Sequence, residues 1–227
     1  MDAALGWMSD PVVVPPDEVL TGSTTNAWAR RIAVREERCK CGVTFMRTRT
    51  VDHMTENGLN KCTVCNSQCC NDSLQDLTTA GEQWLSSDVK PELFKCDVSA
   101  AFRRVPVAPC DWWTQTVIFY FASRLWCAHH KTFSFGAYSS VVSWHRVASA
   151  FLSVCRVLFY ASLLKYVDDY FGWQRALAKM TTTSILSTVF MLCGFLLDPG
   201  KTAAGDALGE PLSEEKDELS STTYCLR

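Results

Sequence analysis

The strongest constraint on the fold comes from residues 162–173, SLLKYVDDYFGW, where two acids interrupt an otherwise apolar and aromatic stretch. The runs SLLKYV and YFGW favour β-strands, and the two residues between them match the spacing of a tight hairpin turn. We therefore predict a hairpin with Asp168 and Asp169 as its turn. Two neighbouring carboxylates repel each other, and a bound cation would remove that cost, although a turn exposed to water explains them as well.

Three further segments indicate an α+β chain. The segment LFKCDVSAAF has the pattern of a buried strand ending at Asp97, after which Pro106 and Pro109 turn the chain. Farther along, apolar residues at steps of three and four predict one helical face: Val141, Trp144, Ala148, Phe151, Cys155 and Leu158. A second helix is predicted over residues 175–193, closed by Gly194, with a strand and turn in FLLDPGKTAAG after it.

Residues 1–39 are expected to form an N-terminal extension. A Pro-rich entry precedes STTNAWARRIAVREER, which predicts a surface helix with Ser23 or Thr24 as its N-cap. The arginines of this region are a weak signal for nucleic-acid binding, because the net charge is −2 and a solvated helix face explains them equally well.

The most apolar region, VASAFLSVCRVLFYASLLK, carries Arg156 near its middle, which argues against a membrane span. The N-terminus has an early acid and no apolar run of signal-peptide length. We therefore expect an intracellular protein, nuclear or cytoplasmic and not secreted, with its twelve cysteines as reduced thiols.

Cysteine spacing raises a zinc site as an alternative role for some of these thiols. The groups CKC at 39–41, CTVC at 62–65 and CC at 69–70 contain enough thiols for four ligands. A C-x-C pair followed by a gap of about twenty residues does not match paired zinc knuckles, so we expect no zinc.

Four motifs follow one another along the chain: KCDVSAAFRRVPV, FSFGAYSSVV, YVDDYFG and GFLLDPGKTAAGDALG. They are an acid strand with an aromatic five residues on, an F-G turn before a helix, Y-x-D-D, and a lysine before L-G. Taken in this order, they resemble the palm motifs of reverse transcriptases. The resemblance implies an RNA-directed DNA polymerase, with an antiparallel palm sheet backed by helices and a partial fingers subdomain.

Upstream, RTRTVDHMTENGLN resembles the fingers segment R-P-I-D-D-x-S-x-S-x-x-N of retroelements that carry tyrosine recombinases. It departs from that pattern at Thr50, where proline is usual, and at His53, where a second acid is usual. The resemblance assigns residues 40–209 to fingers and palm. Residues 210–227, acidic and rich in Ser and Thr, are expected to form a disordered tail, and the chain is expected to lack a thumb and an RNase H domain.

For this family the resemblance implies two Mg²⁺ ions, with Mn²⁺ as an alternative, that assist the joining of a primer 3′-hydroxyl to an α-phosphate. Asp97 and Asp168 would bridge the metals, with Asp169 adjacent and the carbonyl of Val98 as another hard oxygen ligand. From the residues alone, another reading stays open, in which Asp97 caps a helix beginning at Ala100 and the other two acids solvate a turn.

The resemblance also implies residues that bind the incoming nucleotide. Phe102 would exclude a 2′-hydroxyl, and Gly136 would let the backbone approach the nucleotide and template, although a core aromatic and a turn glycine are open alternatives. Arg49, with Arg47 as a substitute, would grip the triphosphate through its guanidinium fork.

Two more residues complete the implied site. Lys201 would donate a proton near the leaving pyrophosphate, although a turn lysine is usually solvated. Tyr166, the first residue of Y-x-D-D, is assigned to substrate binding. The implied partners are an RNA template, a DNA primer and deoxynucleoside triphosphates, without a membrane. The alternative function is a catalytically inactive, retroelement-derived remnant that binds nucleic acid.

Overall fold

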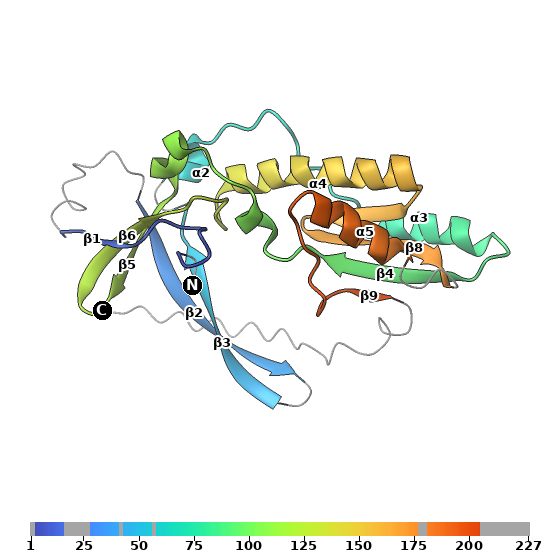
Figure 1. Cartoon of the computed structure of the whole chain (residues 1–227), viewed down its shortest axis with the longest axis horizontal. Helices are drawn as coiled ribbons and strands as arrows, with labels where there is room; N and C mark the ends of the chain where they lie inside the picture. The colour runs from blue at the N-terminus through green and yellow to red at the C-terminus, as the bar shows by residue number, and fades with distance from the viewer. Residues whose placement is uncertain (1–2, 16–27, 41–42, 56–57, 177–180, 205–227) are drawn as a thin grey trace.

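The computed structural model describes residues 3–15, 28–40, 43–55, 58–176 and 181–204. These residues form an α+β fold whose two β-sheets lie toward opposite ends of an elongated molecule (Figure 1). Among the described residues, one sheet has five strands and the other has four. The long helix α4 (Tyr138–Phe159) runs along the four-stranded sheet. The predicted fold class, an antiparallel sheet backed by helices, is confirmed.

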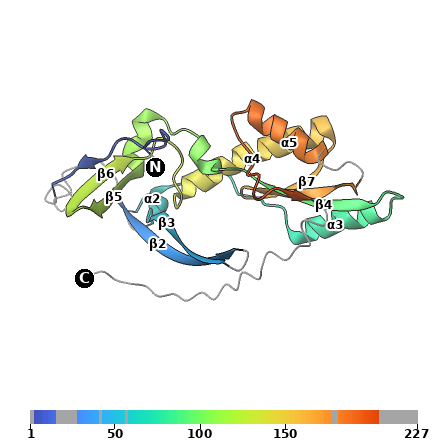
Figure 2. The ribbon, with the colours of Figure 1, turned by 60° about the horizontal axis from the view of Figure 1, so that its bottom comes forward.

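The palm sheet, named after the predicted subdomain, is antiparallel and has the strand order β7-β8-β4-β9. Helices α4 and α5 (Thr181–Leu192) cover one face, and α3 (Leu74–Leu85) lies on the other (Figure 2). The strands are β4 (Pro91–Asp97), β7 (Ser162–Tyr166), β8 (Asp169–Arg175) and β9 (Ala203–Ala204).

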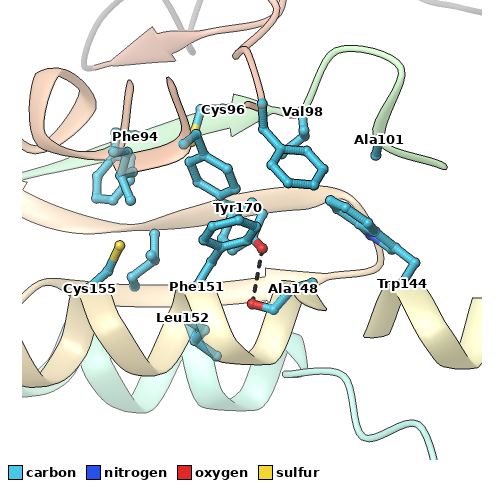
Figure 3. Close-up of a cluster of buried hydrophobic side chains, with 14 of the residues drawn as sticks. Phe94, Cys96, Val98, Ala101, Trp144, Ala148, Phe151, Leu152, Cys155 and Tyr170 are labelled. Carbon is cyan, nitrogen blue, oxygen red and sulfur yellow. Dashed lines mark hydrogen bonds between the residues drawn. The ribbon is translucent and has the colours of Figure 1, made fainter. Parts of the chain in front are cut away.

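The main core lies between the palm sheet and α4 with α5. Phe94, Cys96 and Tyr170 point from the sheet into this layer, where they meet Phe151 and other apolar side chains (Figure 3). The Tyr170 hydroxyl donates a hydrogen bond to the Ala148 carbonyl at 3.0 Å, and burial raises the pKa of Tyr170 above its ordinary range. Burying each such side chain contributes roughly 1.5–3 kcal/mol, so this layer dominates the stability of the palm.

The predicted apolar face of α4 is correct at its centre and wrong at its ends. Trp144, Ala148, Phe151 and Cys155 are buried, but Val141 is 37% exposed and Leu158 is 64% exposed. A helix of this length spans roughly 33 Å, whereas the edge strand β7 beneath it spans roughly 17 Å, so its ends extend past the sheet.

Within the described residues, α4 is the one helix long and apolar enough to cross a membrane, and 33% of that stretch is buried. The core helix of a folded domain meets the same criteria, and the centre of α4 packs on the palm sheet.

The other sheet, the fingers sheet, has the strand order β1-β6-β5-β2-β3. Strands β2 and β5 are parallel, and the other neighbours are antiparallel. Short helical segments connect the two sheets. The strands are β1 (Val12–Val13), β2 (Trp28–Lys40), β3 (Val43–Asp52), β5 (Thr116–Phe121) and β6 (Arg124–His129), and the helical segments are α2 (Leu59–Cys62), η1 (Ala101–Arg104) and η2 (Pro109–Gln115).

The predicted N-terminal surface helix is wrong, because residues 28–40 form β2. This segment pairs residue by residue with β3, whose valines and threonines favour an extended chain, and those cross-strand contacts override the helical propensity of β2. Strands β1 and β2 of the expected N-terminal extension thus belong to the fingers sheet. The predicted caps Ser23 and Thr24, and the tail at 210–227, lie outside the described residues.

The second predicted helix, α5, is described from Thr181 onward, whereas Arg175 ends strand β8. Residues 177–180 lie outside the described part of the chain. The predicted closure at Gly194 is confirmed by its φ of 83° and by a hydrogen bond from the Phe195 N–H to the Phe190 carbonyl at 2.8 Å.

Candidate catalytic site at the ends of β4, β7 and β8

The hairpin that carries the two adjacent acids is present, but its register differs by one residue from the prediction. Tyr166 pairs with Asp169, so the turn consists of Val167 and Asp168. Val167 has a φ of 55°, which costs a β-branched residue on the order of 1–3 kcal/mol. The predicted turn of Asp168 and Asp169 is therefore wrong, and Asp169 is the first residue of β8.

This register brings two of the three acids face to face. Asp97, the last residue of β4, pairs directly with Asp169 across the ladder between β4 and β8. Both side chains lie on the face of the palm sheet opposite to Cys96 and Tyr170, because successive side chains of a strand point to opposite faces. The acids thus face away from α4 and α5.

A lysine neutralises each of these two carboxylates. Lys201 Nζ lies 2.9 Å from Asp97 Oδ2, and this hydrogen bond raises the pKa of Lys201. Lys95 Nζ lies 3.2 Å from Asp169 Oδ1. The predicted site residue Lys201 is therefore beside Asp97, whereas Lys95 was missed because a lysine two residues before a strand-end acid carries no distinctive pattern.

Asp168 occupies the turn beside this pair of carboxylates. The Val98 N–H donates to the Asp168 carbonyl at 3.3 Å, which ties the turn to the end of β4. Burial raises the pKa of the Asp168 carboxyl, and the nearby charges of Asp97 and Asp169 raise it further. A carboxyl in such a negative environment is stabilised by a cation.

The donor chemistry of these residues suits Mg²⁺, which prefers carboxylate and carbonyl oxygens. Within the described residues, no group of three or more His, Cys, Asp or Glu side chains is gathered closely enough to hold a metal ion. Asp97 is directed to Lys201 and Asp169 to Lys95, so a metal that used all three acids would have to displace ammonium groups.

Phe102 and Gly136 lie near the same end of the palm core. Phe102 is 5% exposed, and its ring centroid is 5.1 Å from that of Phe135 and 6.0 Å from that of Trp144. Gly136 has a φ of 92°, and a Cβ there would lie 2.6 Å from the Asp52 carbonyl oxygen. The local contacts therefore match the alternatives of a core aromatic and a turn glycine.

Arg49 and Tyr166 are both exposed. Arg49 lies on the ribbon formed by β2 and β3, where its guanidinium is 3.2 Å from Glu36, and Arg47 pairs with Glu36 across the ribbon. Tyr166 is 57% exposed at the end of β7, opposite Asp169. The structure thus brings Tyr166 next to the acids and leaves Arg49 on the fingers.

A buried polar network around Asp52 connects the fingers to the palm. Arg31 donates to Asp52 through Nε at 2.6 Å and through a terminal nitrogen at 3.0 Å, and His130 Nε2 lies 2.9 Å from Asp52. Arg103, beside Phe102 on η1, contacts His130 Nδ1. A guanidinium can only donate, so Nδ1 accepts and Nε2 donates to Asp52, as in a neutral imidazole.

Ionisation in this network follows from that geometry. Burial alone would raise the pKa of Asp52, but the hydrogen bonds from His130 and Arg31 outweigh burial and hold it well below its usual range. Burial lowers the pKa of His130 despite Asp52. In the sequence, Asp52 stands out only as part of the fingers motif. Arg31, Arg103 and His130 carry no pattern that links them, because Arg31 and His130 are 99 residues apart.

Comparisons with known proteins support the fold. No protein-family model matches the chain, and no curated protein matches its sequence. The chain is similar in structure to a crystal structure of a prototype foamy virus protease-reverse transcriptase mutant, with a TM-score of 0.61 and 15% sequence identity. The similarity covers 88% of this chain and 22% of that chain, and at this identity it shows the fold alone.

Proposed function

We propose that the chain is the fingers and palm of an RNA-directed DNA polymerase of a retroelement, of the kind that carries a tyrosine recombinase. The observation that carries this proposal is the pairing of Asp97 with Asp169 beside the Asp168 turn, on the face of the palm sheet that points away from α4 and α5. Lys201, which the sequence motif predicted to be part of the site, is bonded to Asp97. A fold similar to a protease-reverse transcriptase supports the assignment.

In this proposal Asp97, Asp168, Asp169 and the Val98 carbonyl would hold two Mg²⁺ ions, and Mn²⁺ could replace them. When bound, the ions stabilise the attacking and leaving oxygens of nucleotidyl transfer. Once a bound cation displaced it from Asp97, the Lys201 ammonium would be free to offer a proton and a charge to the leaving pyrophosphate.

The remaining roles concern the incoming deoxynucleotide. Phe102 would act on the sugar from its position at the edge of the core, Tyr166 and Gly136 would line the nucleotide, and Arg49 would bind the triphosphate. Burial of Phe102 makes its role depend on a displacement of Phe135, which is 49% exposed and packs against it.

The ribbon of β2 and β3 offers a surface for the RNA template and DNA primer. The pairing register places Arg38, Arg47 and Arg49 on one face, together with a single acid, Glu36. An excess of guanidinium groups suits phosphate contacts, which supply most of the sequence-independent affinity for nucleic acid.

A second candidate function is a catalytically inactive remnant that binds nucleic acid. The observation favouring it is that both paired acids already have a lysine partner, at 2.9 Å and 3.2 Å. Such ion pairs balance the carboxylates without metal, so the fold does not require a cation to be stable.

We also propose an intracellular location, nuclear or cytoplasmic, without zinc and without membrane insertion. Ten cysteines within the described residues carry free thiols, as expected in a reducing compartment. The apolar centre of α4 is used for packing on the palm sheet.

Primer extension by the full chain on a primed RNA template, with Mg²⁺ and deoxynucleoside triphosphates, tests the two candidates. We expect extension that Asp97→Ala or Asp168→Ala abolishes while circular dichroism and RNA binding persist. Asp88→Ala, an exposed acid on the loop before β4, is the matched control and should leave extension unchanged. RNA binding without extension, in Mg²⁺ or in Mn²⁺, would favour the remnant.

A further inference from the structure

The outer edge of β7 is covered by polar groups from distant parts of the chain. β7 is an edge strand of the palm sheet, and an uncovered edge presents unpaired backbone groups. Leu163, Lys165 and Val167 all bond outside the sheet, which shows that their backbone groups point away from β8.

Asp72 and Arg156 bind the first part of this edge. The Asp72 carboxylate accepts the Lys165 N–H at 2.8 Å, and the Asp72 N–H donates to the Lys165 carbonyl at 3.0 Å. Arg156 Nε donates to the Leu163 carbonyl at 2.8 Å, and its guanidinium lies 3.5 Å from Asp72. The one charged residue in the middle of the apolar sequence is thus used to close a strand edge.

Asn71 continues the same line of contacts into the turn. Its side-chain carbonyl accepts the Val167 N–H at 3.2 Å, while Trp144 Nε1 donates to the Val167 carbonyl at 3.0 Å from α4. Both peptide groups of Val167 are therefore held from outside the hairpin, at a residue whose φ of 55° a β-branched side chain disfavours. The residue that follows is Asp168.

We propose that Asn71, with Asp72 beside it, is a positioning residue that orients the carboxylate of Asp168 for divalent-cation binding. This inference rests on the proposed function. Asn71 accepts a hydrogen bond from the backbone of Val167 and is exposed, so its removal costs little apolar burial. Its contribution is the direction of the Tyr166–Val167 peptide at the start of the turn that carries Asp168, in the way that outer hydrogen bonds orient metal ligands.

The experiment measures Mn²⁺ binding to the full chain by electron paramagnetic resonance, together with amide hydrogen exchange at Val167. Asn71→Ala should weaken Mn²⁺ binding by roughly tenfold and speed exchange of the Val167 amide. Asn71→Asp keeps an acceptor oxygen and should restore most of the affinity. Ser67→Ala is the matched control, because Ser67 lies on the same segment and bonds to Arg146 without touching the turn.

An Asn71→Ala chain that exchanges faster at Val167 but binds Mn²⁺ as tightly as the unchanged chain would overturn the positioning role. Equal losses of affinity in Asn71→Ala and Ser67→Ala would also overturn it, because they would indicate a general effect of the segment. If the unchanged chain binds no Mn²⁺, the proposed function fails and this role fails with it.

Discussion

Lys95 and a divalent cation should compete for Asp169, which leads to a quantitative prediction for Lys95→Met. Lys95 Nζ lies 3.2 Å from Asp169 Oδ1, with the two side chains 45% and 34% exposed. At this exposure an ion pair contributes about 0.2–1 kcal/mol. Without the lysine, a cation no longer has to break that pair, so its affinity should rise by a factor of roughly 1.5–5.

Mn²⁺ titration followed by electron paramagnetic resonance measures this change directly, and Mg²⁺ calorimetry repeats it with the proposed ion. Ionic strength must be held constant, because salt screens exposed pairs. Lys95→Arg keeps the charge and should bind as the unchanged chain does. Lys61→Met removes the same charge at an exposed position on α2 and controls for net charge.

Weaker Mn²⁺ binding by Lys95→Met, or a gain that Lys61→Met reproduces in full, would refute the competition. The first result would mean that Lys95 holds Asp169 in a conformation the cation needs. The second would mean that only the overall charge of the chain matters.

Three further predictions concern the core and the turn. Phe102→Val should raise the ratio of ribonucleotide to deoxynucleotide kcat/KM. Loss of the ring contacts should also lower the free energy of unfolding, measured with urea, by on the order of 2 kcal/mol. An unchanged ratio would leave Phe102 as a core residue only. Gly136→Ala should destabilise the chain more than Gly58→Ala, because both glycines have positive φ but only Gly136 has a backbone oxygen 2.6 Å from the added Cβ; equal losses in thermal unfolding would contradict the clash. Asp168→Asn should abolish nucleotide addition yet raise the Tm at neutral pH, since the raised pKa of Asp168 means that its charged form destabilises the fold. The gain in Tm should disappear as the pH falls and the carboxyl of the unchanged chain becomes protonated. A Tm difference independent of pH would contradict this reasoning.

Local sequence patterns were sufficient to predict the main elements of the palm. A short buried run and the turn signals after it predicted β4 up to Asp97, and steps of three and four predicted the buried centre of α4. Both signals depend on which side of one element is buried, and that is written in consecutive residues. Motif order then predicted that Lys201 would belong with the acids, and the ion pair to Asp97 agrees with that expectation.

The sequence failed where a partner far along the chain decides the outcome. Residues 28–40 have helical propensity, but the free energy of pairing with β3 makes them a strand. The turn moved to Val167 and Asp168 because Asp169 pairs with Asp97, about seventy positions away, and Trp144 and Asn71 hold the strained Val167.

By itself, then, the sequence determined the order of the strands and helices that carry the candidate site and the identity of its acids, because these follow from local periodicity and motif spacing. Only the tertiary structure decided which charges meet. Lys95 with Asp169, Asn71 with Val167, and Asp52 with Arg31 and His130 are contacts between residues on separate elements. Such contacts depend on sheet order and strand register, which no single segment of the chain specifies.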